Sequence, residues 1–166
     1  MSTATADIEQ KYITFALGEE EYGIPVLHVW EIVKIDSLVR IPRARDYFLG
    51  FLDLRGHVLP VIDLKKKLGL QGQDSDEFNR AIIIQTAGRR VGLAVDRVLH
   101  VLNFPPENID SGPPTMKSSS SKFIAGVGKH KDQFIILMNL ENLFTRDEIN
   151  ELGYDEAEGA QTPAQG

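Results

Sequence analysis

One pattern occurs twice in this chain, as Gly23-Ile24-Pro25-Val26-Leu27-His28-Val29 and again, 69 positions later, as Gly92-Leu93-Ala94-Val95-Asp96-Arg97-Val98. Two weaker echoes follow in the same order at an offset of 76. They pair Phe48-Leu49-Gly50-Phe51 with Ile124-Ala125-Gly126-Val127, and Val61-Ile62-Asp63-Leu64 with Leu137-Met138-Asn139-Leu140. Because the echoes keep their order and spacing, we predict one structural unit that is used twice within a small domain.

The composition is that of a globular protein of one domain or two small, closely packed ones. The chain has 166 residues, of which 42% are hydrophobic, enough for a buried core. It has no cysteine, which excludes disulfides, thiolate metal sites and cysteine nucleophiles. A net charge of -6 argues against a general nucleic-acid binder, which normally carries a basic field. We find no signal-peptide pattern at the N-terminus and no apolar run of the roughly 20 residues that a membrane helix needs.

Short strands dominate the expected secondary structure. Tyr12 to Leu17 alternates as a strand does, and about ten such segments separated by glycine and proline turns favour small β-barrels or a sandwich. The spacing of apolar residues predicts a short helix over 25–31, and one or two short strands are expected over 35–41. A longer amphipathic helix is expected from Leu140 to Leu152.

The ends and one central loop are expected to lie outside the folded core. Residues 1–10 and the acidic residues 153–166 hold too few apolar groups to pack, so we predict disordered tails. The polar stretch 69–79 is the expected seam between the halves, with exchange of strands between them allowed. The domain itself is therefore expected over 11–152.

The sequence offers no catalytic, cofactor or metal-binding constellation. The four histidines lie in separate segments, and none forms an HxxxH or HExxH pattern. Ser118 to Ser121 lacks the G-x-S-x-G elbow of a nucleophile, and Gly126-Val127-Gly128-Lys129 lacks the spacing of a phosphate-binding loop. We therefore expect a protein that displays surfaces rather than an enzyme.

Two features stand out as candidate contacts. In Asp53-Leu54-Arg55-Gly56, a strand ends and a guanidinium is presented at a turn, suited either to a partner's carboxylate or to an ion pair within the fold. The stretch from Val26 to Ile32 includes Trp30, the only tryptophan, and is apolar on nearly every side of the expected helix. Any part of it left exposed is typical of a partner site.

Taken together, these segments resemble the CheW family of chemotaxis adaptor proteins. The resemblance is carried by Phe15 to Val26, Val29-Trp30-Glu31-Ile32, Ile41-Pro42-Arg43-Ala44, Gly50 to Leu64, Val91 to Val98, Gly126-Val127-Gly128 and Ile136 to Glu141. It covers about residues 11–152, and the ordered series is far more specific than any one motif. Asp53 departs from the family's usual asparagine and adds a carboxylate two residues from Arg55.

The resemblance implies a mainly β fold of two packed five-stranded SH3-like barrels, with a short helix after the second strand and a C-terminal helix. It implies a cytoplasmic, non-enzymatic adaptor without cofactor or metal, recruited to membrane receptor arrays. The implied partners are the cytoplasmic tip of methyl-accepting chemoreceptors and the regulatory domain of a CheA-type histidine kinase. Neither nucleic-acid binding nor membrane insertion is implied.

The resemblance also assigns contact residues. Glu31, expected on the short helix, and Arg55 match positions associated with receptor contact, and the apolar groove between the barrels would include Val26, Val29, Val98 and Leu99. Kinase contact is placed around Gly50 and Phe51.

Three other interpretations stay open at this point. A CheW-like coupling protein of a pathway that controls pili, gliding or development would have the same sequence features. An enzyme built on a double barrel would need a polar cluster in the groove. A nucleic-acid-binding SH3-like barrel would need a basic-aromatic strand face.

Overall fold

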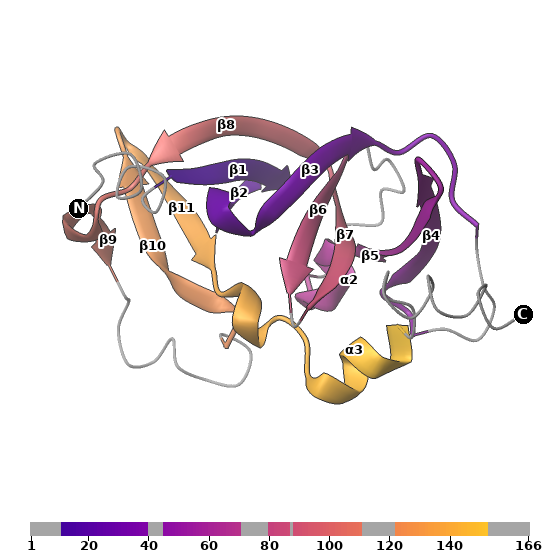
Figure 1. Ribbon diagram of the computed structural model, residues 1–166. Helices are drawn as coiled ribbons and strands as arrows, with labels where there is room; N and C mark the ends of the chain where they lie inside the picture. Colours follow the sequence, from indigo (N-terminus) through magenta and orange to yellow (C-terminus); the bar gives the residue numbers. More distant parts are fainter. Residues whose placement is uncertain (1–10, 40–44, 71–79, 87, 111–121, 153–166) are drawn as a thin grey trace, which may run out of the picture.

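The computed structural model describes residues 11–39, 45–70, 80–86, 88–110 and 122–152. Two β-sheets, one of six strands and one of five, lie side by side, with β3 and β8 crossing the top of the molecule and α3 beneath (Figure 1). The strands are β1 Lys11–Leu17, β2 Glu20–Pro25, β3 Val29–Lys34, β4 Phe48–Leu54, β5 His57–Asp63, β6 Arg80–Thr86, β7 Arg89–Val95, β8 Arg97–Asn103, β9 Ile109–Asp110, β10 Ile124–His130 and β11 Gln133–Met138. The 3-10 helices are η1 Val26–His28, η2 Pro106–Asn108 and η5 Leu140–Asn142, and the α-helices are α2 Leu64–Lys67 and α3 Arg146–Leu152.

The two sheets are built on one plan, and each takes strands from both halves of the chain. Sheet A has the order β8-β1-β2-β11-β10-β9, and sheet B has the order β3-β6-β7-β5-β4. The first five strands of sheet A correspond one by one to those of sheet B, and the two-residue β9 is an addition. The architecture confirms the predicted mainly β, SH3-like fold class. The sheets do not divide at residues 69–79, because β5 and β7, on either side of that stretch, pair in parallel within sheet B.

The glycines of the repeated pattern lie where two strands run parallel and close together. Gly92 on β7 pairs with Val61 on β5, and Gly23 on β2 pairs with Leu137 on β11. A Cβ atom at Gly92 would lie 3.1 Å from a methyl of Val61, and one at Gly23 would lie 3.1 Å from a methyl of Leu137. The echo in the sequence thus reflects the same close approach in both sheets.

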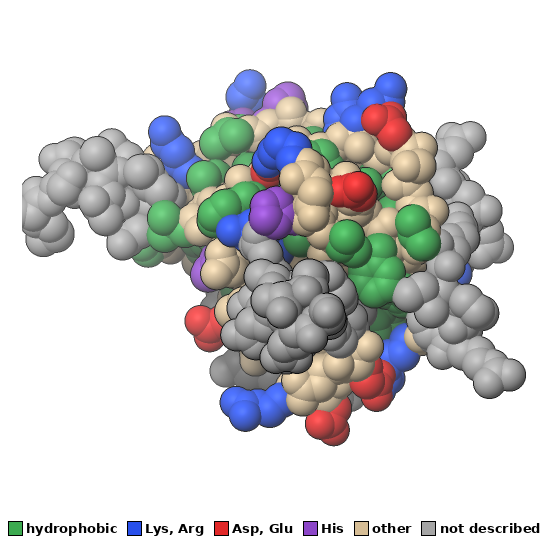
Figure 2. All heavy atoms as spheres, turned by 45° about the vertical axis from the view of Figure 1, so that its right-hand side comes forward, with side chains coloured by type: hydrophobic (Ala, Val, Ile, Leu, Met, Phe, Trp, Pro, Cys, Tyr) green, Lys and Arg blue, Asp and Glu red, His purple; other side chains and the backbone are tan. Residues whose placement is uncertain are grey.

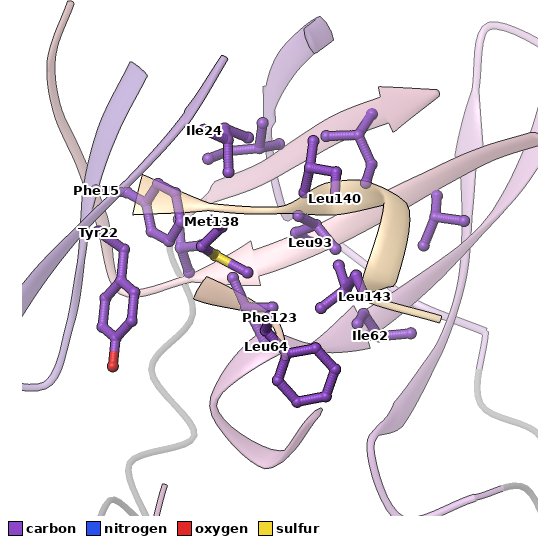
Figure 3. Close-up of a cluster of buried hydrophobic side chains, with 14 of the residues drawn as sticks. Phe15, Tyr22, Ile24, Ile62, Leu64, Leu93, Phe123, Met138, Leu140 and Leu143 are labelled. Atoms are coloured by element: carbon purple, nitrogen blue, oxygen red, sulfur yellow. The ribbon is translucent and has the colours of Figure 1, made fainter. Parts of the chain in front are cut away.

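One hydrophobic core joins the sheets. Figure 3 shows Phe15 and Ile24 of sheet A converging with Ile62 and Leu93 of sheet B, and Leu140 and its neighbours close the cluster. All but Leu140 of these five are fully buried. Burial of such side chains contributes about 1.5–3 kcal/mol each, so the sheets stabilise one another.

The C-terminal helix is shorter than the sequence predicts. Instead of one helix over 140–152, the chain forms η5, leaves helical geometry, and starts α3 at Arg146. The Thr145 hydroxyl accepts a hydrogen bond from the Glu148 N–H, and Glu148 in turn accepts one from the Thr145 N–H. This reciprocal capping box starts a new helix, which explains the break.

The first half differs from the predictions in two places. The predicted short helix after the second strand is present as η1, but it ends at His28 instead of residue 31, and Val29 starts strand β3, so Glu31 lies on a strand rather than a helix. The strands expected over 35–41 are not formed by 35–39, where Val39 makes a single bridge to Phe51. The predicted tails and most of the 69–79 stretch lie outside the described residues.

Candidate functional site

Glu31 and Arg55 form a two-pronged ion pair at the surface. The Arg55 Nη1 donates to Glu31 Oε2 at 3.0 Å, and Nη2 donates to Oε1 at 2.6 Å. The Arg55 side chain is 67% exposed and that of Glu31 is 27% exposed. Fork-to-carboxylate geometry of this kind fixes the orientation of both groups.

The turn that presents Arg55 is built by its own residues. Leu54 pairs with His57, so Arg55 and Gly56 form a two-residue connection, and Arg55 has a positive φ of 52°. The Asp53 carboxylate accepts the Gly56 N–H at 2.9 Å. Asp53 therefore stabilises the turn, and the internal ion pair of Arg55 is made with Glu31, 24 residues away, rather than with Asp53 or Asp63.

The pair also connects the two outer strands of sheet B. Glu31 lies on β3 and Arg55 follows β4, and these strands are at opposite ends of the five-strand order. The pair therefore helps to close the sheet into a barrel. The hydrogen bond from Arg55 keeps the pKa of Glu31 below its usual value, and Glu31 raises the pKa of Arg55, so both groups stay charged at neutral pH.

Exposed apolar side chains lie on the same segment of chain as Glu31. Leu27, Trp30 and Ile32 are 58%, 52% and 36% exposed. Trp30 is the extra residue of a β-bulge. Val29 faces Ile84 and Glu31 faces the adjacent Ile83, so no residue of β6 pairs with Trp30. Figure 2 turns the right-hand side of Figure 1 forward and shows hydrophobic side chains among charged ones on that face.

Arg90 stacks on the indole of Trp30. Its guanidinium carbon lies 3.7 Å from the ring centroid, a cation–π contact. Arg90 is in β7, at the end of the β6–β7 hairpin, and sequence reasoning missed it. No local sequence pattern predicts this contact, because the two residues are 60 positions apart.

Three of the four predicted groove residues come together. Val26, Val29 and Val98 are half-buried and pack against the same core cluster between the sheets. Leu99 is also half-buried, at the start of a bulge in which Val98 faces Phe15 and Val101 faces Ile13. It corresponds by the offset of 69 to Trp30.

The predicted kinase-contact residues are on a different strand. Gly50 is buried at a bulge of β4, and Phe51 is half-buried, with its backbone paired to Val39. β4 and β3 are the two edge strands of sheet B, and the Arg55–Glu31 pair joins them where the sheet closes.

The described ranges contain neither a metal-binding cluster nor a membrane-spanning helix. No three His, Asp or Glu side chains there are grouped so that they could hold a metal ion. In the same part of the chain, no helix has the length and apolar character needed to cross a membrane. What the described surface offers is a charged pair beside exposed apolar residues, an arrangement suited to binding another protein.

Comparison with known proteins gives a consistent result. A family model described as "CheW-like domain" matches residues 11–148. The chain is 34% identical over 142 residues to the chemotaxis protein CheW of Klebsiella aerogenes, covering 86% of each chain. It is 31% identical over 137 residues to CheW of Helicobacter pylori, covering 82% of each.

A solved structure shows the same fold. The crystal structure of the scaffolding protein TtCheW from Thermoanaerobacter tengcongensis superposes with a TM-score of 0.74 at 34% identity. The match covers 84% of this chain and 95% of that one.

Proposed function

The chain belongs to the CheW family of chemotaxis scaffold proteins, and from this premise we propose that it couples chemoreceptors to a histidine kinase. In this proposal it catalyses no reaction. It binds the cytoplasmic tip of a methyl-accepting chemoreceptor on one surface and the regulatory domain of a CheA-type kinase on another. Its place in the cell is then the cytoplasmic face of a receptor array.

The observation that carries the receptor surface is the Glu31–Arg55 pair, formed by the same segment of chain that exposes Leu27, Trp30 and Ile32. A receptor tip is a helical hairpin, whose apolar side chains can pack on such residues and into the groove formed by Val26, Val29, Val98 and Leu99. Arg55 retains donors beyond those given to Glu31, since a guanidinium has five N–H groups. An acidic receptor side chain can therefore be recognised without separation of the pair.

The kinase surface is proposed at β4. Gly50 and Phe51 lie on β4, whereas Leu27, Trp30 and Ile32 lie on η1 and β3. In this proposal different residues meet the two partners, so that both can be bound at once, as an adaptor requires.

The test uses a charge swap at the paired residues. Arg55→Glu places two carboxylates together and removes the cation, so we expect strong loss of receptor binding, and Arg55→Ala should cause a smaller loss. The double variant Glu31→Arg with Arg55→Glu restores an ion pair in the reverse orientation. Melting temperature, affinity for the receptor's cytoplasmic fragment and affinity for the kinase are measured on each sample.

The proposal expects the swap to recover the melting temperature but not receptor binding, because the receptor recognises the charge at position 55. Kinase affinity should be unchanged in every variant. Recovery of receptor binding together with stability would show that the pair acts only on the fold. Joint loss of both partners in Arg55→Glu would have the same meaning.

A further inference from the structure

The internal repeat places a second charged corner on sheet A. The hairpin of β10 and β11 closes through the pair His130 and Gln133, as that of β4 and β5 closes through Leu54 and His57. Lys131 therefore occupies the position of Arg55, and its φ is 56° where that of Arg55 is 52°. Among described residues other than glycine, only these two have a positive φ.

The residue of sheet A that corresponds to Glu31 is not a carboxylate. Glu31 faces Ile83 across β3 and β6, and the offset of 69 equates these residues with His100 and Thr14. The structure confirms the placement, because the His100 N–H donates to the Thr14 hydroxyl at 3.1 Å. An imidazole thus stands where the first corner has a carboxylate.

The second corner consequently keeps its cation available. Within the described ranges, Lys131 forms no ion pair, whereas Arg55 is held by Glu31. One pocket of about 360 Å³ is lined by Glu21, His100, Leu102, His130, Lys131, Asp132 and Gln133. It presents an ammonium, two imidazoles and an amide as hydrogen-bond donors, and the carboxylates of Glu21 and Asp132 as acceptors.

The carboxylates of Glu21 and Asp132 limit which anion the pocket can take. The Glu21 Oε2 is buried and has no hydrogen-bond partner among the described residues. A ligand that brings only negative charge would face the repulsion of both carboxylates. A peptide brings backbone N–H donors as well, which offset this repulsion while its side-chain carboxylate binds Lys131.

We propose that this corner is a second protein-binding site, which takes an acidic side chain of a partner's peptide segment in the position that the Glu31 carboxylate occupies in the first corner. Lys131 is the charged anchor, His100 and Gln133 are supporting donors, and Leu102 is the apolar wall for the side-chain methylenes. The assignment does not depend on which partner binds the Glu31–Arg55 surface.

The test is a titration of the full-length ¹⁵N-labelled protein with the capped peptide Ac-Ala-Glu-Ala-NH₂, followed by amide chemical shifts. The matched probe Ac-Ala-Gln-Ala-NH₂ differs only in charge. We expect saturable shifts of residues 130–133 and 100 with the glutamate peptide, and binding about tenfold weaker or absent with the glutamine peptide. Lys131→Met should abolish the response, and Lys129→Met, an exposed lysine outside the pocket, should not.

A second pair of variants tests the comparison of the corners directly. His100→Glu supplies an internal carboxylate for Lys131 and should block the peptide, whereas His100→Gln should still bind it. A dispersed amide spectrum will show whether each variant is folded. If His100→Glu does not fold, the result with Lys131→Met decides the test. The proposal is overturned if the two peptides shift the same amides equally, if Lys129→Met weakens binding as much as Lys131→Met, or if no shift saturates. Equal saturation of these amides by inorganic phosphate would show a simple anion site instead.

Discussion

The ammonium of Lys65 is almost completely buried, and its carboxylate partner connects elements of both sheets. Lys65 Nζ lies 2.9 Å from Asp96 Oδ1, with side-chain exposures of 1% and 19%. Asp96 Oδ2 also accepts the Gly18 N–H at 2.7 Å. The network joins α2, the β7–β8 corner and the β1–β2 turn.

Removal of the carboxylate should be costly because the buried Lys65 ammonium loses its ion pair with Asp96. We expect Asp96→Ala to lower the free energy of unfolding by about 3–5 kcal/mol in urea titrations. The double variant Lys65→Met with Asp96→Ala also removes the buried charge and should recover part of that loss. If the double variant is no more stable than the single one, the buried charge is not the cause.

At the scale of elements, the parallel contact of β5 and β7 depends on the missing side chain of Gly92. A Cβ there would meet Val61 at 3.1 Å and Ile83 at 3.2 Å, both in the closed interior of sheet B. Gly92→Ala should therefore cost about 1–3 kcal/mol by overpacking. Val61→Ala makes room for the new methyl group. In a double-mutant cycle, the loss of stability in the double variant should therefore be smaller than the sum of the losses in the two single variants. Simple additivity would mean that Val61 does not limit the approach.

Helix α3 is held by a network that depends on pH. Glu148 lies 3.2 Å from the largely buried Lys67 ammonium, which contacts the rings of Tyr47, Phe123 and Phe144. Burial raises the pKa of Glu148, but the Thr145 N–H and Lys67 outweigh it, and the net pKa is below the usual 4.5. Its contribution is therefore complete above pH 4.5 and lost as the pH falls through the folded-state pKa.

The lowered pKa of Glu148 predicts how the stability of a Glu148→Gln variant compares with that of the wild type as the pH changes. At neutral pH the variant should be less stable than the wild type by about 1–2 kcal/mol, because the ion pair with Lys67 is lost while the amide oxygen can still accept the Thr145 N–H. The difference should shrink as urea titrations are repeated at decreasing pH below 4.5. A difference that is constant with pH would exclude the charge of Glu148 as its source.

The same elements show what sequence reasoning can and cannot predict. Strands such as β6 and β7 follow from continuous apolar runs, and the duplicated plan follows from echoes kept in order. The helix predicted over 25–31 is shorter than expected, because a bulge at Trp30 shifts the strand alternation, and over a few residues the result imitates helical spacing. The pairing of Glu31 with Arg55 could not be predicted, since it depends on how two edge strands meet in space. The corner at His100 and Lys131 could have been found by applying the offsets of the repeat to Glu31 and Arg55.

At the scale of the whole molecule, the path of the chain makes the sheets interdependent. The chain builds β1 and β2 of sheet A, then all of sheet B from β3 to β7, and returns for β8 to β11. Division of the chain at any one position would not separate the two sheets, and the core cluster contains residues from both. A repeat that exchanges its strands in this way gives two barrels the stability of one domain.

We therefore expect the protein to unfold in a single cooperative transition. Trp30 is the only tryptophan and lies in sheet B, so its fluorescence reports on that sheet, while far-UV circular dichroism reports on the strands of both. The two signals should give the same urea midpoint, as two-state unfolding requires. Gly23→Ala in sheet A and Gly92→Ala in sheet B should each shift both signals together, because each sheet completes the other's core. A tryptophan midpoint that moves with Gly92→Ala but not with Gly23→Ala would show that the sheets unfold separately, and that the shared core contributes less than their internal packing.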